Sequence, residues 1–339
     1  MTIPVTEIEL GDIQTLRGAG LIAARRYPTA VNAVRDEAFW ARWGLRALLA
    51  LGAGQFLAGV VFFFAYNWND LSDIAKFAVV EGAVTIAALG ALAVGLDRMF
   101  GQVLLIAASV LTGVLLATIG QAYQTGADVF ELFLAWAVLI LPWTVISRSA
   151  VQWLLWLVVA EVALWLYCEQ VPMVVGEMTE DELSVLSGAT IALALLVREV
   201  AVRQSCLWLG GHWTRLILLF AAILILFMPA AGSVLDIYGA EAPALCIGAF
   251  VAVSAVGAIV YWQKLPDFAA LVIIIAFADA FFICVGVRLI DESIGFSWSD
   301  AGTGLSSLGA MILWAIAGTG GSAMAMRRLR TELRAAGTS

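Results

Sequence analysis

The sequence predicts an all-α fold, a polytopic integral membrane bundle of about ten transmembrane helices with both termini in the cytoplasm. Hydrophobic residues make up 63% of the 339 residues, against roughly half in a soluble domain, and the mean hydropathy is +0.97. The apolar residues come in runs of about 20, the length that a helix needs to cross roughly 30 Å of hydrocarbon. These runs do not alternate apolar with polar residues, as the strands of a membrane barrel do.

The apolar runs divide the chain into parts. Ten spans are expected at 44–66, 75–96, 100–122, 129–147, 149–168, 183–198, 215–235, 242–262, 268–290 and 303–326. Residues 1–43 mix apolar and charged residues, which predicts a cytoplasmic segment with an amphipathic helix at the membrane interface, and no cleavable signal peptide is expected there. The remaining parts are a membrane core of five spans (44–168), an acidic outer loop (169–182), a second membrane half (183–326) and a basic cytoplasmic tail (327–339). The sixth span is short and is expected to end at Arg198.

The distribution of charge predicts the orientation, because Lys and Arg are retained on the cytoplasmic side of a membrane. With both termini inside, all of the 18 basic residues fall in cytoplasmic segments except Lys76 and Arg288. The outer loop 169–182 has acidic residues and no basic one. The net charge of −8 therefore reflects acidic outer loops and gives no reason to expect a nucleic-acid partner.

The sequence offers few groups for catalysis or metal binding. The four cysteines are scattered singly and His212 is the only histidine, so neither a zinc site nor a haem site is expected, and no cofactor is predicted. No serine or cysteine nucleophile with a histidine base is expected, because the only histidine is predicted to lie on the cytoplasmic side. No Walker motif or dinucleotide fingerprint is present in a strand-to-helix context. ATP hydrolysis and dinucleotide redox chemistry are therefore not expected.

Acidic side chains within the spans are candidates for a binding site, because each costs several kcal/mol in lipid unless it is neutralised or paired. They are Glu81, Glu161 and Asp279, and Glu131 begins the fourth span. One interpretation is an outward-facing polar cavity that binds a cation or a small solute. The other is structural, with carboxyls that hold neighbouring helices together. Arg288 and Lys76 are possible counter-ions, although both could instead extend to lipid headgroups.

Two polar, aromatic turns are expected on the outer side of the membrane. The turn between the third and fourth spans contains Gln121, Tyr123, Gln124, Thr125 and Asp128. The turn after the first span contains Tyr66, Asn67 and Trp68. Glycines at 120 and 126 permit tight backbone geometry, and the polar side chains can cap helix ends. Capping does not require so many polar groups together, so contact with a ligand or partner is the competing interpretation.

Small residues recur every four positions in two spans and allow close helix approach. They are Ala83, Ala87, Ala91 and Gly95 in the second span and Ala317, Gly321 and Ala325 in the tenth. These residues have two competing interpretations, which are packing within the bundle and a homo-oligomer face. The tryptophans near span ends are interpreted mainly as interfacial anchors.

Two motifs, FFFAYNWNDLSDIAKFAVVE and IGQAYQTGADVFELFLAWAVLILPW, resemble the DUF2157 family of bacterial polytopic membrane proteins over residues 15–165. The region after residue 170 is loosely similar to the DUF4401-like extensions of some relatives. The resemblance implies a multi-pass protein of the bacterial inner membrane. The family name records an unknown activity, so the resemblance supplies no catalytic residue.

Three functions compete at this point. The first is a transporter-like or cation- and solute-binding protein with an outward-facing polar cavity. The alternative is a non-catalytic scaffold that presents its outer turns to an envelope protein. The third is an enzyme that acts on a lipid-linked substrate, with an outer carboxylate as general base. Membrane lipids are expected partners in all three cases.

Overall fold

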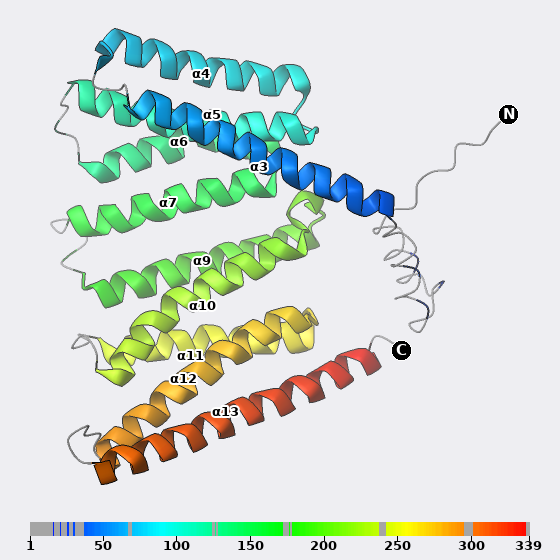
Figure 1. Cartoon of the computed structure of the whole chain (residues 1–339), viewed down its shortest axis with the longest axis vertical. Helices are drawn as coiled ribbons and strands as arrows, with labels where there is room; N and C mark the ends of the chain where they lie inside the picture. The colour runs from blue at the N-terminus through cyan, green and yellow to red at the C-terminus, as the bar shows by residue number, and fades with distance from the viewer. Residues whose placement is uncertain are drawn as a thin grey trace. The chain divides into compact units, whose positions relative to one another are not determined.

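The computed structural model describes residues 37–66, 70–123, 128–171, 178–236, 242–294 and 301–336, with a few single residues elsewhere. Within these ranges the chain forms helices and no strand, which confirms the all-α fold. The long helices are α3 (Glu37–Tyr66), α4 (Asp73–Val94), α5 (Met99–Tyr123), α6 (Val129–Ser147), α7 (Ala150–Gln170), α9 (Glu180–Arg203), α10 (His212–Leu235), α11 (Pro243–Ile259), α12 (Phe268–Ile294) and α13 (Ala301–Ala336) (Figure 1). Two short elements are a 3-10 turn, η2 (Leu207–Leu209), and a π-helical turn, η3 (Val260–Lys264).

The chain separates into two units, residues 1–76 and 77–339. In the first unit the structure describes α3, whose residues 47–64 include no charged side chain. Most of the expected cytoplasmic segment 1–43 lies outside the described residues, so its amphipathic helix stays a prediction.

Nine of the described helices are long and apolar enough to cross a membrane. They are α4, α5, α6, α7, α9, α10, α11 with η3, α12 and α13. Each of these helices overlaps one of the predicted spans, with ends that differ by several residues, and α3 overlaps the first predicted span. The orientation of the termini stays a prediction.

Helix α9 extends beyond the sixth predicted span at both ends, and both extensions contain charged residues. The helix α9 continues past Arg198 to Arg203, because the Arg198 side chain is paired inside the bundle. The same helix begins earlier than the sixth predicted span, at Glu180, so acidic residues assigned to the outer loop lie in its first turn. There they face the partial positive charge of a helix N-terminus. Thr179 caps this end by accepting a hydrogen bond from the backbone N–H of Glu182 at 3.2 Å.

Helices α5, α6 and α7 pack together through an apolar contact and a few polar ones. The indole of Trp136 lies against Gly113, and its Nε1 donates to the Ser109 carbonyl at 2.7 Å. From α7, the buried Gln152 Nε2 donates to the Ser109 hydroxyl at 2.8 Å. The fourth and fifth spans meet at Arg148, as expected, in a left-handed turn with φ 47°. These hydrogen bonds add to the apolar contacts that hold the three helices together.

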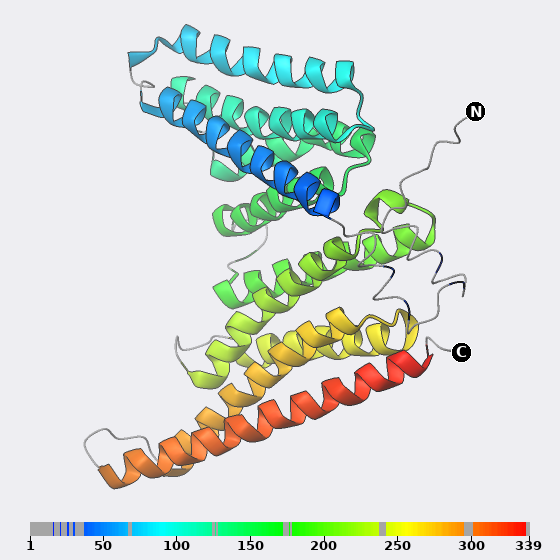
Figure 2. The same ribbon diagram turned by 45° about the vertical axis from the view of Figure 1, so that its right-hand side comes forward.

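Helices α9 to α13 form the second group, in which α10 packs against α9, α11 and α12 (Figures 1 and 2). Its buried residues include Leu219, Ile223 and Leu226. Helix α13 packs against α12, where the Trp314 ring stacks on Phe282 at 4.6 Å between centroids. This arrangement brings the cytoplasmic ends that the sequence predicts for α9, α10, α11 and α12 into one region.

The two stripes of small residues have different surroundings. In α4, Ala87 and Ala91 are buried, and the turn at Gly95 approaches Gly101 of α5 closely. In α13, Ala317 and Gly321 are exposed within the described part of the chain. Packing within the chain therefore accounts for the first stripe, while a homo-oligomer face stays open for the second.

Candidate functional site

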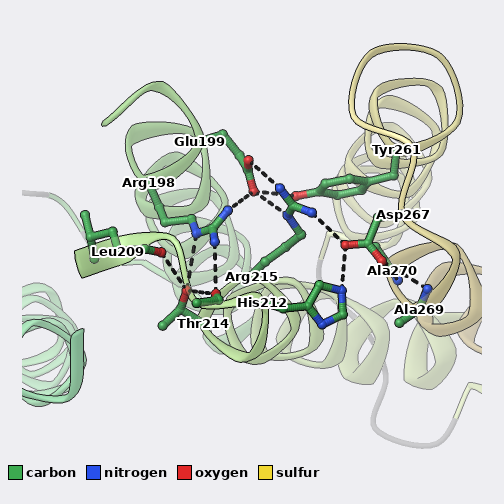
Figure 3. Close-up of polar contacts among 11 residues, drawn as sticks. Arg198, Glu199, Leu209, His212, Thr214, Arg215, Tyr261, Asp267, Ala269 and Ala270 are labelled. Atoms are coloured by element: carbon green, nitrogen blue, oxygen red, sulfur yellow. Dashed lines mark hydrogen bonds and ion pairs between the residues drawn. The ribbon is translucent and has the colours of Figure 1, made fainter. Parts of the chain in front are cut away.

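A cluster of charged and polar side chains, all buried or mostly buried except His212, lies where α9, α10, η3 and the start of α12 meet (Figure 3). We call it the ionic cluster and define it by the following residues: Arg198, Glu199, His212, Thr214, Arg215, Tyr261 and Asp267. It lies at the end of the bundle for which the sequence predicts the cytoplasmic side. Because charges inside a bundle are costly unless they are paired, the partners of each group decide what the cluster can do.

Arg198 is the most deeply buried member, with 1% of its side chain exposed. Its Nη1 donates to Glu199 Oε1 at 2.7 Å, and its Nη2 donates to the Gly211 carbonyl at 2.9 Å. Its Nε donates to the Thr214 hydroxyl at 3.2 Å, and this hydroxyl donates to the Gly211 carbonyl at 2.7 Å. All three guanidinium nitrogens therefore have partners.

Arg215 of α10 connects the two carboxylates of the cluster. Its Nε and Nη2 donate to the two oxygens of Glu199 at 2.7 and 3.0 Å, the forked geometry that a guanidinium and a carboxylate prefer. Its Nη1 donates to Asp267 Oδ2 at 2.6 Å. The guanidinium also lies 5.4 Å from the centre of the Tyr261 ring, and the Tyr261 hydroxyl donates to Glu199 Oε1 at 3.4 Å.

Asp267 joins the ionic cluster to the start of α12. Its Oδ1 accepts from the backbone N–H groups of Ala269 and Ala270, at 3.0 and 3.2 Å, so it caps the helix. Its Oδ2 lies 2.9 Å from His212 Nε2. Burial by itself raises the pKa of Asp267, but the hydrogen bonds from Arg215, Ala270 and His212 outweigh it and leave the pKa below its ordinary value.

The π-helical turn η3 places Tyr261 in the cluster. The Leu265 N–H donates to the Val260 carbonyl, five residues back, at 2.9 Å, and the Asp267 N–H donates to the Tyr261 carbonyl at 3.1 Å. A π-turn of this kind shifts the face that the helix presents. The shift leaves Tyr261 buried at 2% exposure, close to Glu199.

The ionic cluster is balanced, since two arginines face two carboxylates. The hydrogen-bonding groups of its arginines and carboxylates are paired within the protein, so these residues hold the helices together. No group of three or more His, Cys, Asp or Glu side chains that could hold a metal ion occurs among the described residues. Removing one partner of such a buried pair costs about 3–5 kcal/mol, because the other charge stays buried.

The hairpin between α5 and α6, for which the sequence predicts the outer side, brings some of the predicted site residues together, and we call it the outer hairpin. Gln121, Asp128 and Glu131 line a hollow of about 610 Å³. The Tyr123 ring stacks on Phe77 of α4, with centroids 5.7 Å apart. The turn contains Gly126 at φ +62°, the left-handed conformation expected of a glycine there. Gln124 and Thr125 lie outside the described residues.

The first outer turn is described only in part. Tyr66 ends α3 and is 88% exposed, while Asn67 and Trp68 lie outside the described residues. The shared surface expected of the two turns joins residues of the two units, so it stays a prediction.

The structure does not bring the four acidic residues of the spans into one cavity. Glu81 and Glu131 are exposed on α4 and α6. Glu161 of α7 interacts with Thr190 of α9, and one of its oxygens is buried without a hydrogen-bond partner. Helix α12, which contains Asp279, packs against α10, α11 and α13 and lies away from α4 in both views (Figures 1 and 2).

Asp279 lies at a contact between helices, and the expected counter-ions Arg288 and Lys76 pair with other acids. Asp279 Oδ1 is buried against α13, 2.7 Å from the position of a β-carbon at Gly318, and lacks a hydrogen-bond partner. Arg288 pairs with Glu292 at 2.7 Å and approaches Asp236 at 3.9 Å, and Lys76 pairs with Asp73 at 3.3 Å. These pairs join both basic residues to acids near helix ends, and a binding role for these residues individually stays a prediction.

The sequence reasoning missed the ionic cluster, although one signal was present. Arg198 and Glu199 are adjacent charges inside an otherwise apolar helix, the pattern that indicates a buried pair. The arginines at 198 and 215 were used only to predict sidedness. Asp267 could not be assigned to them from the sequence, because it lies 52 residues beyond Arg215.

These observations define the class: an integral membrane protein built of many apolar helices, with a buried ionic contact in its second half. Residues 14–153 match the model of the family described as "Predicted membrane protein (DUF2157)", which confirms the predicted resemblance over these residues. The DUF4401-like extension stays a prediction. No curated protein and no solved structure matches the chain. The outer hairpin lies within the matched residues, and the ionic cluster lies beyond them.

Proposed function

We propose that this chain is a non-catalytic membrane protein that binds a cationic group of a small solute at the outer hairpin. The observation that carries this proposal is the hollow between α5 and α6, which Gln121, Asp128 and Glu131 line and no basic residue lines. Asp128 is the N-cap of α6 and Glu131 lies in its first turn, and both line the hollow. The proposed location, the bacterial inner membrane, rests on the family resemblance.

Both carboxylates of the hollow are available to a ligand. Asp128 stands at the N-cap of α6, but its side chain makes no capping hydrogen bond. Glu131 is exposed, and no ion pair of either residue occurs within the described part of the chain. The N-terminal end of α6 favours negative charge there, which lowers the gain from a cation. Because exposed ion pairs contribute about 0.2–1 kcal/mol each, we expect weak binding by these two carboxylates, with a Kd on the order of tens of millimolar or weaker.

Binding is better supported than transport. A transported cation needs polar groups through the depth of the membrane, and the buried acids Glu161 and Asp279 lie in separate helix contacts. The ionic cluster offers no further step, since its charges are paired with one another.

A scaffold that binds a protein partner is the second candidate. The observation that favours it is Tyr123, which is 70% exposed beside the hollow and is held by its stacking on Phe77. Exposed, rigidly held aromatic residues are common anchors of protein interfaces. Photocrosslinking from position 123 in native membranes distinguishes this function: a specific protein adduct supports it, and adducts with lipid alone count against it.

Thermal unfolding of the purified chain in detergent tests solute binding, with choline and spermidine as probes. A ligand at ten times its Kd stabilises the folded state by about 1.4 kcal/mol. We expect this stabilisation in the wild type and its loss in the double variant Asp128→Asn/Glu131→Gln. The matched control is Glu169→Gln, an exposed carboxylate at the end of α7 that does not line the hollow. Equal shifts in the wild type and the double variant would rule out this site.

A further inference from the structure

A second hollow, distinct from the outer hairpin, lies between α9 and α11 beside the ionic cluster. Its volume is about 620 Å³. Its polar lining residues are Glu199, Arg203, Tyr261 and Lys264, and the others are apolar side chains or glycine. We call this hollow the α9–α11 groove. It combines a long apolar wall with charged groups at one end only.

The lining residues follow helical spacing on both walls. On α9 they are Ala192, Leu195, Leu196, Glu199, Val200 and Arg203, and on α11 and η3 they run from Ala252 to Lys264. At 1.5 Å per residue, each wall is about 16–18 Å long. This length is about half of the ~30 Å of hydrocarbon in a bilayer, so the groove extends through one leaflet.

The charged end of the groove is suited to an anion. Arg203 ends α9 and Lys264 ends η3, and both side chains are exposed. Neither makes an ion pair with another residue in the described ranges. Glu199 also lines the groove, but Arg198 and Arg215 hold its carboxylate, so its charge is already compensated. Two uncompensated positive charges therefore stand where the groove reaches the headgroup level.

We propose that the α9–α11 groove binds one acyl chain of an anionic phospholipid, with the phosphate held by Arg203 and Lys264. The acyl chain covers the apolar wall, which includes Val256 at 61% exposure. The phosphate lies at the end where the sequence predicts the cytoplasmic leaflet. Basic residues between helices at a membrane surface are a recognised site for anionic headgroups. The ionic cluster serves this site by fixing α9 against α10 and η3.

Native mass spectrometry tests the site on the full chain, extracted into mild detergent from vesicles of equal parts phosphatidylglycerol and phosphatidylcholine. The wild type is expected to retain phosphatidylglycerol in preference. The double variant Arg203→Gln/Lys264→Gln is expected to lower this preference about 25-fold, or about five-fold for each basic side chain. The matched control, Arg98→Gln/Arg148→Gln, removes two exposed basic residues outside the groove and is expected to keep the preference.

A second pair of variants tests the apolar wall. Val256→Trp fills the groove and is expected to lower retention of both lipids, whereas Val251→Trp, on α11 but outside the groove, is expected to keep it. Equal retention of the two lipids by the wild type, or the same loss in the basic control variant, would overturn the proposal. So would a second copy or another protein retained in place of lipid and displaced by Val256→Trp.

Discussion

Replacing Glu199 with glutamine tests the role of the ionic cluster as a lock between helices. The Glu199 carboxylate accepts hydrogen bonds from Arg198, Arg215 and Tyr261, and 10% of the side chain is exposed. Without its charge, Arg198 is left with neutral partners only, and Arg215 keeps Asp267. We expect a loss of about 3–5 kcal/mol in the free energy of unfolding, the range for a broken buried ion pair.

The assay is denaturant titration of the detergent-solubilised protein, followed by tryptophan fluorescence. The control is Glu292→Gln, which removes an exposed ion pair with Arg288 and is expected to cost less than about 1 kcal/mol. The double variant Arg198→Met/Glu199→Gln removes one charge of each sign. We expect it to recover much of the lost stability, because apolar replacement of a whole buried pair is often neutral.

Two outcomes would refute this reasoning. If the free energy of unfolding of Glu199→Gln lies within about 1 kcal/mol of the wild-type value, the ion pairs of Glu199 do not hold the helices together. If the double variant is no more stable than the single one, the loss does not come from an uncompensated arginine. Either result would also remove the support that the α9–α11 groove receives from the cluster.

Three further predictions concern pH and glycine positions. Because the pKa of Asp267 is lowered in the folded state, its contribution to stability is present above about pH 4 and is lost as the pH falls through the folded-state pKa. The variant Asp267→Asn should therefore show a smaller decrease of the thermal midpoint than the wild type between about pH 5 and pH 3. A β-carbon at Gly113 would lie 2.6 Å from the Trp136 ring, so Gly113→Ala should lower the free energy of unfolding by about 1–3 kcal/mol in denaturant titration. The control Gly120→Ala places its β-carbon in open space and should raise the free energy of unfolding by about 0.5–1 kcal/mol. Gly126→Ala, at φ +62°, should cost about 1–2 kcal/mol by the same measurement, and an unchanged midpoint would contradict the left-handed turn.

Much of the fold follows from local patterns in the sequence. The span from 129 to 147 has the same ends as α6, although it contains Pro142, because the surrounding residues are apolar and can only satisfy their backbone groups as a helix in lipid. The outer hairpin was also predictable, since Gln121 and Asp128 are only seven residues apart and the turn between them brings them together.

Tertiary contacts decided what local patterns could not. The tryptophans were interpreted mainly as interfacial anchors. Trp136 instead packs on Gly113, and its indole N–H donates to the Ser109 carbonyl. The sixth span was expected to end at Arg198, and the helix continues beyond it to Arg203. Glu199 and the groups that hydrogen-bond to Arg198 compensate its charge. One of the two interpretations placed Asp279 and Glu81 in a shared cavity, whereas α12, which contains Asp279, packs against α10, α11 and α13.

The amino-acid sequence alone predicted the long apolar helices of the described ranges, their approximate ends and the polar character of the outer hairpin, because each depends on residues close together in the chain. Only the tertiary structure decided which charges meet. Arg215 pairs with Glu199, 16 residues before it, and with Asp267, 52 residues after it. Such pairs depend on which helix faces pack together, and hydrophobicity along a single span does not specify that.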